Sequence, residues 1–315
     1  MPRRQVILLC IGLTAIAFAV GRYSAQLSSR IAPGSYREFV QALESRDWAR
    51  RAHAMSGFVG GLGPENLGPA LIAIEPHRRW LSQDELRLFM IAWTRFDPEA
   101  AFQRGLSWPD HTRSKGAAAA IYGWALQDPE AAREAAMAVD DSSLKALLLD
   151  RIVAAWAHGE DREGVTRYIA SLPDSPSRDR LTAILIREIL ADGHGAVIEW
   201  AESIPAVNDG DMASTAFQKA AGILAQDDHG VASKFAEDHL AKPWGQNAPA
   251  AVARHWAQKD PAATLEWARS LPEGGARDQA IHTAFARWEK IQPAAAEQWL
   301  AQTPPSPELD GPRFA

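Results

Sequence analysis

Apolar residues along this chain recur at the spacing of one face of an α-helix. Leu144, Leu148, Ile152 and Trp156 follow one another at every fourth position. Leucine and isoleucine mark the same helical face again in residues 181–189. Because positions three and four apart lie on one side of a helix, each stretch predicts an amphipathic helix with one buried face.

Tryptophan extends this pattern over most of the chain. Five tryptophans share one register, with spacings of 31, 32, 100 and 32 residues. The gap of 100 residues accommodates two further units that keep the rest of the motif without the tryptophan. The sequence therefore predicts seven units, anchored at Trp93, Trp124, Trp156, Glu188, Leu224, Trp256 and Trp288.

A helix-start signal follows each anchor by four residues. The position holds Asp97, Asp128 or Asp260 in three units, and proline comes next in each of them. An aspartate at the N-cap accepts hydrogen bonds from free backbone N–H groups, and proline suits the first helical position. The corresponding residues in the remaining units are Glu160, Asp192, Asp228 and Gln292.

Each predicted unit is a longer helix, a tight turn and a shorter helix. Alanine pairs and a second aromatic residue follow the turn, and a proline closes most units. Such a unit cannot bury its apolar face alone and must stack on its neighbours. We therefore expect an all-α fold, a right-handed α-solenoid of about seven two-helix repeats of about 32 residues over residues 91–304.

The flanking segments follow other patterns. Residues 31–90 predict a helical N-terminal cap with a helical segment over 36–55, a glycine-rich loop from Gly57 to Gly63, a short apolar segment near 71–74, and a helix from Ser82 into Trp93. Residues 305–315 are proline-rich and predict a C-terminal tail.

The repeat resembles TPR-like α-solenoids. It resembles more closely a group of bacterial proteins with a membrane-spanning N-terminus and repeats of the form W-x3-DP-x-AA…LP. The resemblance covers about residues 36–304 and departs from a true TPR in its period and in lacking the W-x2-LG-x2-Y signature. It implies an architecture and carries no catalytic residues over to this chain.

The N-terminus is a candidate membrane segment. Arg3 and Arg4 precede an uncharged apolar run from Val6 to Val20. This run fits either an uncleaved signal anchor over residues 1–30 or a removable signal peptide cleaved after Ala19. With the anchor, the chain is a single-pass inner-membrane protein, and the basic N-terminal flank favours a periplasmic body.

Composition excludes several functions. The chain has 315 residues, 33 basic and 39 acidic side chains and a net charge of −6, which is no footprint for nucleic acid. Its one cysteine, Cys10, lies in the apolar run, so the folded region has no disulfide framework, zinc–thiolate site or cysteine nucleophile. We expect no cofactor and no enzymatic activity, since no zinc-protease, nucleophile-elbow, Walker or dinucleotide motif occurs.

Two local patterns suggest ion binding but have simpler interpretations. Residues 208–211 read Asn-Asp-Gly-Asp, yet lack the EF-hand spacing, so a polar loop explains them equally. His158, His194 and His229 fall in the turns of consecutive units. Stacked helix pairs lie roughly 9 to 10 Å apart, so a shared metal site would need three turns to converge, and a solvated edge or a partner-binding strip are the alternatives.

Two units break the motif and are the candidate partner-binding region. The units anchored at Glu188 and Leu224 lack the tryptophan and are 36 residues apart, which predicts a protruding turn over 207–212. Irregular turns in repeat proteins often carry the binding face, although a decayed repeat would look the same. The candidate residues are Asp192, His194, Asp209, Asp211, Asp227, Asp228 and His229.

These observations predict a membrane-anchored scaffold for protein–protein interaction. Its partner would be a protein or peptide, the N-terminal helix would bind the membrane, and nucleic acid would not be bound. Two alternatives remain open. One is an α/α cell-envelope enzyme that acts on a glycan with two convergent carboxylates, and the other is a purely structural spacer.

Overall fold

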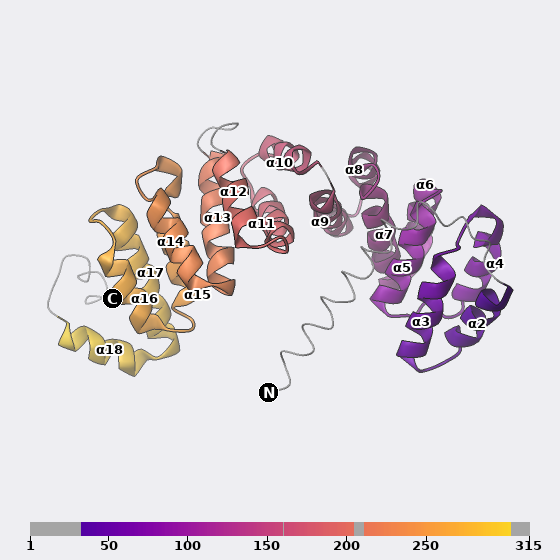
Figure 1. Ribbon diagram of the computed structural model, residues 1–315, viewed down its shortest axis with the longest axis horizontal. Coiled ribbons are helices and arrows are strands. Elements are labelled where there is room, and N and C mark those ends of the chain that lie inside the picture. Colours follow the sequence, from indigo (N-terminus) through magenta and orange to yellow (C-terminus); the bar gives the residue numbers. More distant parts are fainter. Residues whose placement is uncertain (1–32, 160, 205–210, 304–315) are drawn as a thin grey trace. The chain divides into compact units, whose positions relative to one another are not determined.

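The computed structural model describes residues 33–159, 161–204 and 211–303. These residues form α-helices and one 3-10 helix, without a β-strand among them (Figure 1). The predicted all-α class is thus confirmed. The chain divides into two compact units, residues 1–155 and 156–315, which are considered separately.

Unit one contains the predicted cap and the first repeats. Its helices are α2 (Pro33–Leu43), α3 (Trp48–Val59), α4 (Pro64–Ile74), α5 (Gln83–Thr94), α6 (Pro98–Ser107), α7 (Asp110–Ala125), α8 (Pro129–Met137) and the larger part of α9 (Ser142–His158). Helix α7 packs against α5, α6 and α8, while α3 packs against α2 and α5.

Unit two continues the alternation of helices. It contains α10 (Arg162–Ser171), α11 (Pro176–Leu190), α12 (His194–Ser203), α13 (Asp211–Asp227), α14 (His229–His239), the 3-10 helix η3 (Pro243–Gly245), α15 (Ala248–Trp256), α16 (Pro261–Ser270), α17 (Gly275–Ile291) and α18 (Pro293–Gln302). Helix α13 packs against α11 and α15, and α15 packs against α17, so these four helices form a row.

The helix boundaries follow the repeat motif. All seven anchor positions lie in the last turns of α5, α7, α9, α11, α13, α15 and α17. A shorter helix follows six of them. Helix α15 is an exception to the expected length, because it has only nine residues and Pro249 lies at its start, after a separate 3-10 turn at Pro243.

The predicted aspartate caps form where proline follows them. Asp97, Asp128 and Asp260 each accept a hydrogen bond at 3.0 Å from the backbone N–H three residues later. The third repeat, anchored at Trp156, instead uses Asp161 as its N-cap, one residue after the expected position. The cap expected at Asp192 is absent, because α12 begins after Gly193, whose φ of 104° suits glycine.

The tryptophan anchors are buried to different degrees. Trp93, Trp156 and Trp288 are 4 to 6% exposed, as expected for core residues. Trp124 and Trp256 are partly exposed. Two of the buried anchors contact the second aromatic of their own repeat, Trp156 with Tyr168 and Trp288 with Trp299, at ring-centroid distances of 6.0 and 5.8 Å. These contacts fix each long helix against the short helix that follows it.

The cap differs from its prediction in detail. The segment expected as one helix over 36–55 is broken at residues 44–47, where Asp47 caps α3. Gly57 lies inside α3 rather than in a loop, and the loop between α3 and α4 is shorter than expected. Ser82 starts the next helix as predicted, and its cap partner Glu85 also pairs with Arg51 at 2.8 Å in a largely buried contact.

Two predicted segments lie outside the described residues. Residues 1–32 contain the candidate membrane segment, and 304–315 contain the proline-rich tail. Among the helices from α2 to α18, none is long and apolar enough to cross a membrane.

Candidate functional site

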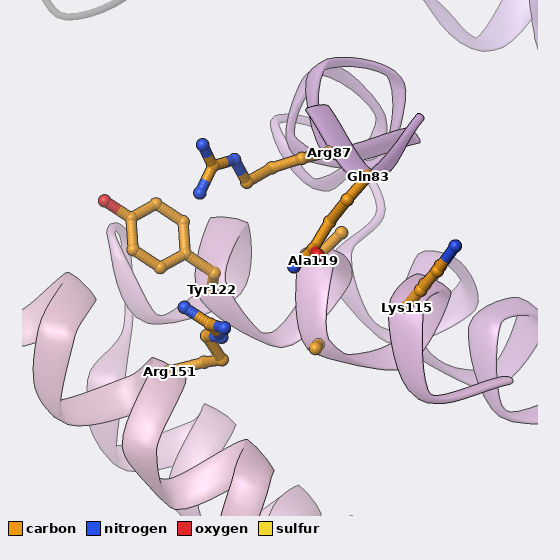
Figure 2. A pocket seen from close by; sticks show the side chains of 7 residues that line it. Gln83, Arg87, Lys115, Ala119, Tyr122 and Arg151 are labelled. Carbon is orange, nitrogen blue, oxygen red and sulfur yellow. The ribbon is translucent and has the colours of Figure 1, made fainter. Parts of the chain in front are cut away.

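A shallow hollow in unit one gathers positive charge from three successive long helices (Figure 2). Helix α5 contributes Gln83 and Arg87, α7 contributes its central face, and α9 contributes Arg151. The complete lining is Gln83, Arg87, Lys115, Ala118, Ala119, Tyr122 and Arg151. Because every helix supplies part of it, no single repeat could form this site.

The central face of α7 has the spacing of one helical stripe. Lys115, Ala118, Ala119 and Tyr122 lie at positions i, i+3, i+4 and i+7, which share one side of a helix. The two alanines are buried and form the floor, while Lys115 and Tyr122 lie at either end of it and remain partly exposed. The stripe thus combines an apolar floor with one cation and one phenol.

The hollow exists because α7 carries small residues where its neighbours carry large ones. Ala118 lies six residues before its anchor tryptophan, the position that Arg87 holds in the preceding repeat. Ala119 lies five residues before the anchor, the position that Arg151 holds in the following repeat. Two methyl groups therefore stand between two guanidinium side chains.

Glycines allow α7 to pack closely against the helices beneath the hollow. A Cβ atom on Gly116 would lie 2.4 Å from the Trp108 ring, and one on Gly123 would lie 2.4 Å from the Thr94 hydroxyl. Both distances are shorter than real contacts, so only glycine permits this packing. The close contact fixes α7 and hence the position of Lys115 and Tyr122 on its outer face.

The charged side chains of the hollow are all cations. Arg87 donates to the exposed carboxylate of Asp84 at 3.0 Å, an i,i+3 pair of the kind that contributes little in water. Lys115 and Arg151 make no hydrogen bond or ion pair with the side chains that the structure describes. The hollow is thus locally positive within a chain whose net charge is −6.

This site was missed at the sequence level. The one available signal was the helical spacing from Lys115 to Tyr122, which looks like an ordinary solvated face. The stripe forms a site only together with Arg87 and Arg151 from other helices. The relative register of three packed helices cannot be predicted from the local sequence of any one of them.

The predicted partner-binding residues lie in unit two, and most of them gather at one edge. His194 and Asp227 are in contact, with 2.6 Å between Nε2 and Oδ2. Asp228 caps α14 by accepting from the N–H groups of Gly230 and Val231, and these bonds hold its pKa below its ordinary value. His229 stacks on Trp256 with 4.5 Å between ring centroids.

The same edge carries a series of contacts that join one repeat to the next. Arg162 donates to Asp192 at 2.6 Å. His158 contacts Glu188 at 2.9 Å, and this hydrogen bond raises the pKa of His158 despite partial burial of the ring. Both pairs are separated by 30 residues in sequence, which is about one repeat. Each pair therefore connects one repeat to the next.

Asp211 is not part of this edge, contrary to our expectation. It is the first residue of α13, whereas Asp227 is the last. At 1.5 Å per residue, the two lie about 24 Å apart along the helix. The physical reason is the topology, because turns that enter a long helix and turns that leave it lie at opposite ends. Asp209 and the expected protruding turn fall largely on residues 205–210, outside the described residues.

Histidine and acidic residues do not converge further in the described part of the chain. Across residues 33–159, 161–204 and 211–303, no three His, Cys, Asp or Glu side chains are placed to share a metal ion. His255 contacts Gln226 at 3.5 Å, and burial together with Arg254 and Arg287 lowers its pKa.

Comparisons with protein-family models, with curated proteins and with solved structures find no significant match to this chain.

Proposed function

We propose that this chain is a membrane-anchored helical-repeat scaffold that binds a protein or peptide partner in the cell envelope. In this proposal its units stack as a right-handed α-solenoid of the TPR-like kind, residues 1–30 anchor it in the inner membrane, and the body is periplasmic. The observation that carries the proposal is the hollow formed jointly by α5, α7 and α9. A surface built from several repeats is what a scaffold offers to an extended partner.

The chemistry of the hollow favours binding over catalysis. Its charged groups, Arg87, Lys115 and Arg151, are cations that hold anionic groups, whereas glycoside hydrolysis uses a pair of carboxylates. Lys115 and Arg151 have no ion-pair partner among the described residues, so both are available to a bound anion, whereas Arg162 is already paired across repeats. These contrasts support a scaffold with a working face.

Site-specific crosslinking tests the proposal. Full-length chain with benzoylphenylalanine in place of Tyr122 is expressed in its native membranes and irradiated. We expect a discrete adduct with one protein. The matched control carries the same group at Gln103, an exposed residue of the short helix α6, and should give none.

The outcomes separate the alternatives. Adding Ala119→Leu to the Tyr122 variant should abolish the adduct by filling the floor of the hollow. Absence of any adduct from Tyr122, or equal labelling from Gln103, would instead favour the spacer and contradict the scaffold.

A further inference from the structure

The hollow offers two kinds of contact to a ligand at once. Arg87 and Arg151 present planar guanidinium groups that pair with carboxylates through two parallel hydrogen bonds, and Lys115 adds a point charge. The lining also includes the methyl groups of Ala118 and Ala119, which form a small apolar floor. Figure 2 shows Ala119 and the ring of Tyr122 among the charged side chains. A ligand that matches both features carries negative charges on either side of an apolar group.

We infer that the hollow binds an acidic peptide segment, in which carboxylates pair with Arg87, Lys115 and Arg151 while an apolar side chain between them rests on Ala118 and Ala119. This inference rests on the scaffold function proposed above and names the chemistry of its partner. The carboxylates replace water around cations that have no strong partner in the described part of the chain, where the only ion pair that binding would break is the weak Arg87–Asp84 contact.

An acidic peptide fits the hollow better than nucleic acid or a membrane surface does. Nucleic-acid binding depends on many phosphate contacts along an extended basic surface, whereas this site offers three cations on a chain of net charge −6. A lipid surface is flat and favours cations that project outward, whereas the buried methyl groups of Ala118 and Ala119 form a floor between the cations. A short, flexible chain can lie across this shallow hollow and place charged and apolar groups alternately.

Binding of a defined probe tests the inference. The probe is a fluorescein-labelled twelve-residue peptide of alternating Glu and Leu pairs, added to detergent-solubilised full-length chain and followed by fluorescence anisotropy. Its control is the same peptide with Gln in place of Glu. We expect the acidic peptide to bind at least about tenfold more tightly, in keeping with several charge-assisted hydrogen bonds, and to weaken as salt is added.

Protein variants locate the site. Arg87→Gln with Arg151→Gln should weaken binding by about tenfold or more. The matched control, Arg254→Gln with Arg269→Gln, removes two exposed guanidinium groups from unit two and should leave affinity within about twofold, since neither residue lines the hollow. Ala119→Leu keeps every charge and should also abolish binding, and circular dichroism checks that each variant is folded.

The inference is overturned if the Gln peptide binds as well as the Glu peptide, or if the unit-two variant loses as much affinity as the hollow variant. It is also overturned if a twelve-residue oligothymidine or vesicles of phosphatidylglycerol compete as well as the acidic peptide. Each of these results can occur while the crosslink from Tyr122 is still observed. In that case a partner of other chemistry occupies the hollow, and the scaffold function stands without the acidic ligand.

Discussion

Gly105 of α6 lies directly against Ala117 of α7, so closely that a Cβ atom on Gly105 would come within 2.5 Å of the Ala117 backbone nitrogen. The neighbouring atoms belong to the backbone and cannot rotate away. This contact lets α6 pack closely against α7, the helix that forms the floor of the hollow.

Gly105→Ala should therefore destabilise the protein. The added methyl group costs about 1 to 3 kcal/mol or more through overpacking, which exceeds the roughly 0.5 to 1 kcal/mol that alanine gains over glycine within a helix. Gly57→Ala is the matched control, because Gly57 is exposed in α3 with no atom within 4 Å of the added Cβ. Thermal unfolding should show a lower midpoint for the first variant and an equal or higher one for the second.

Trp156 and Trp80 should respond in opposite ways to truncation. Trp156 is 4% exposed and contacts Tyr168, so Trp156→Ala should cost about 3 to 5 kcal/mol. Trp80 is 77% exposed, and Trp80→Ala should change the free energy of unfolding by no more than about 0.5 kcal/mol. Urea titrations of both variants measure the difference, and near-wild-type stability of Trp156→Ala would refute the anchor role.

His158 and His255 should titrate on opposite sides of 6.5, the ordinary histidine pKa. Because Glu188 raises the pKa of His158, the protonated ring stabilises the fold at pH below 6.5, and this contribution is lost as pH rises through the raised value. Burial lowers the pKa of His255, so the fold loses stability as pH falls from 6.5 through the lowered value.

NMR titration of the two imidazole signals checks this prediction. Glu188→Gln should lower the pKa of His158, and Arg254→Gln should raise that of His255. The assignment of causes fails if both rings titrate with one midpoint or if neither variant moves its histidine.

Removing residues 1–30 should release the chain from membranes. The full-length chain is expected to stay in the membrane pellet after carbonate extraction, because the apolar run from Val6 to Val20 resists removal by salt and high pH. The shortened chain should appear in the supernatant with an unchanged helical circular dichroism spectrum. Release of the full-length chain by carbonate would argue against an anchor and for a cleaved signal peptide.

Much of the helical order was predictable from local signals. The Asp128–Pro129 pair marks a helix start through hydrogen bonding and a fixed φ, both of which act within a few residues. Ser82 and Glu85 likewise predict a helix start from their spacing alone. In contrast, Asp192 carries the right side chain at the expected position but pairs with Arg162, and glycine begins the helix instead.

The site was harder to predict, because it depends on relations between helices. The hollow is lined by Arg87, Lys115 and Arg151, which occupy three different positions relative to their anchor tryptophans. The misplacement of Asp211 was avoidable, since the length of α13 alone separates it from Asp227.

The contacts between repeats limit which changes of length the chain can accommodate. Arg162 meets Asp192, Trp200 meets Thr166 and Trp267 meets Glu237, with sequence separations of 30, 34 and 30 residues. Inserting one whole repeat would preserve the spacing of about 30 to 34 residues on which these contacts depend. Inserting half a repeat would change that spacing and separate the paired side chains. Such a chain can gain or lose binding surface by whole units during evolution, while the hollow itself, defined by two alanines in one helix, can arise or vanish through substitutions alone.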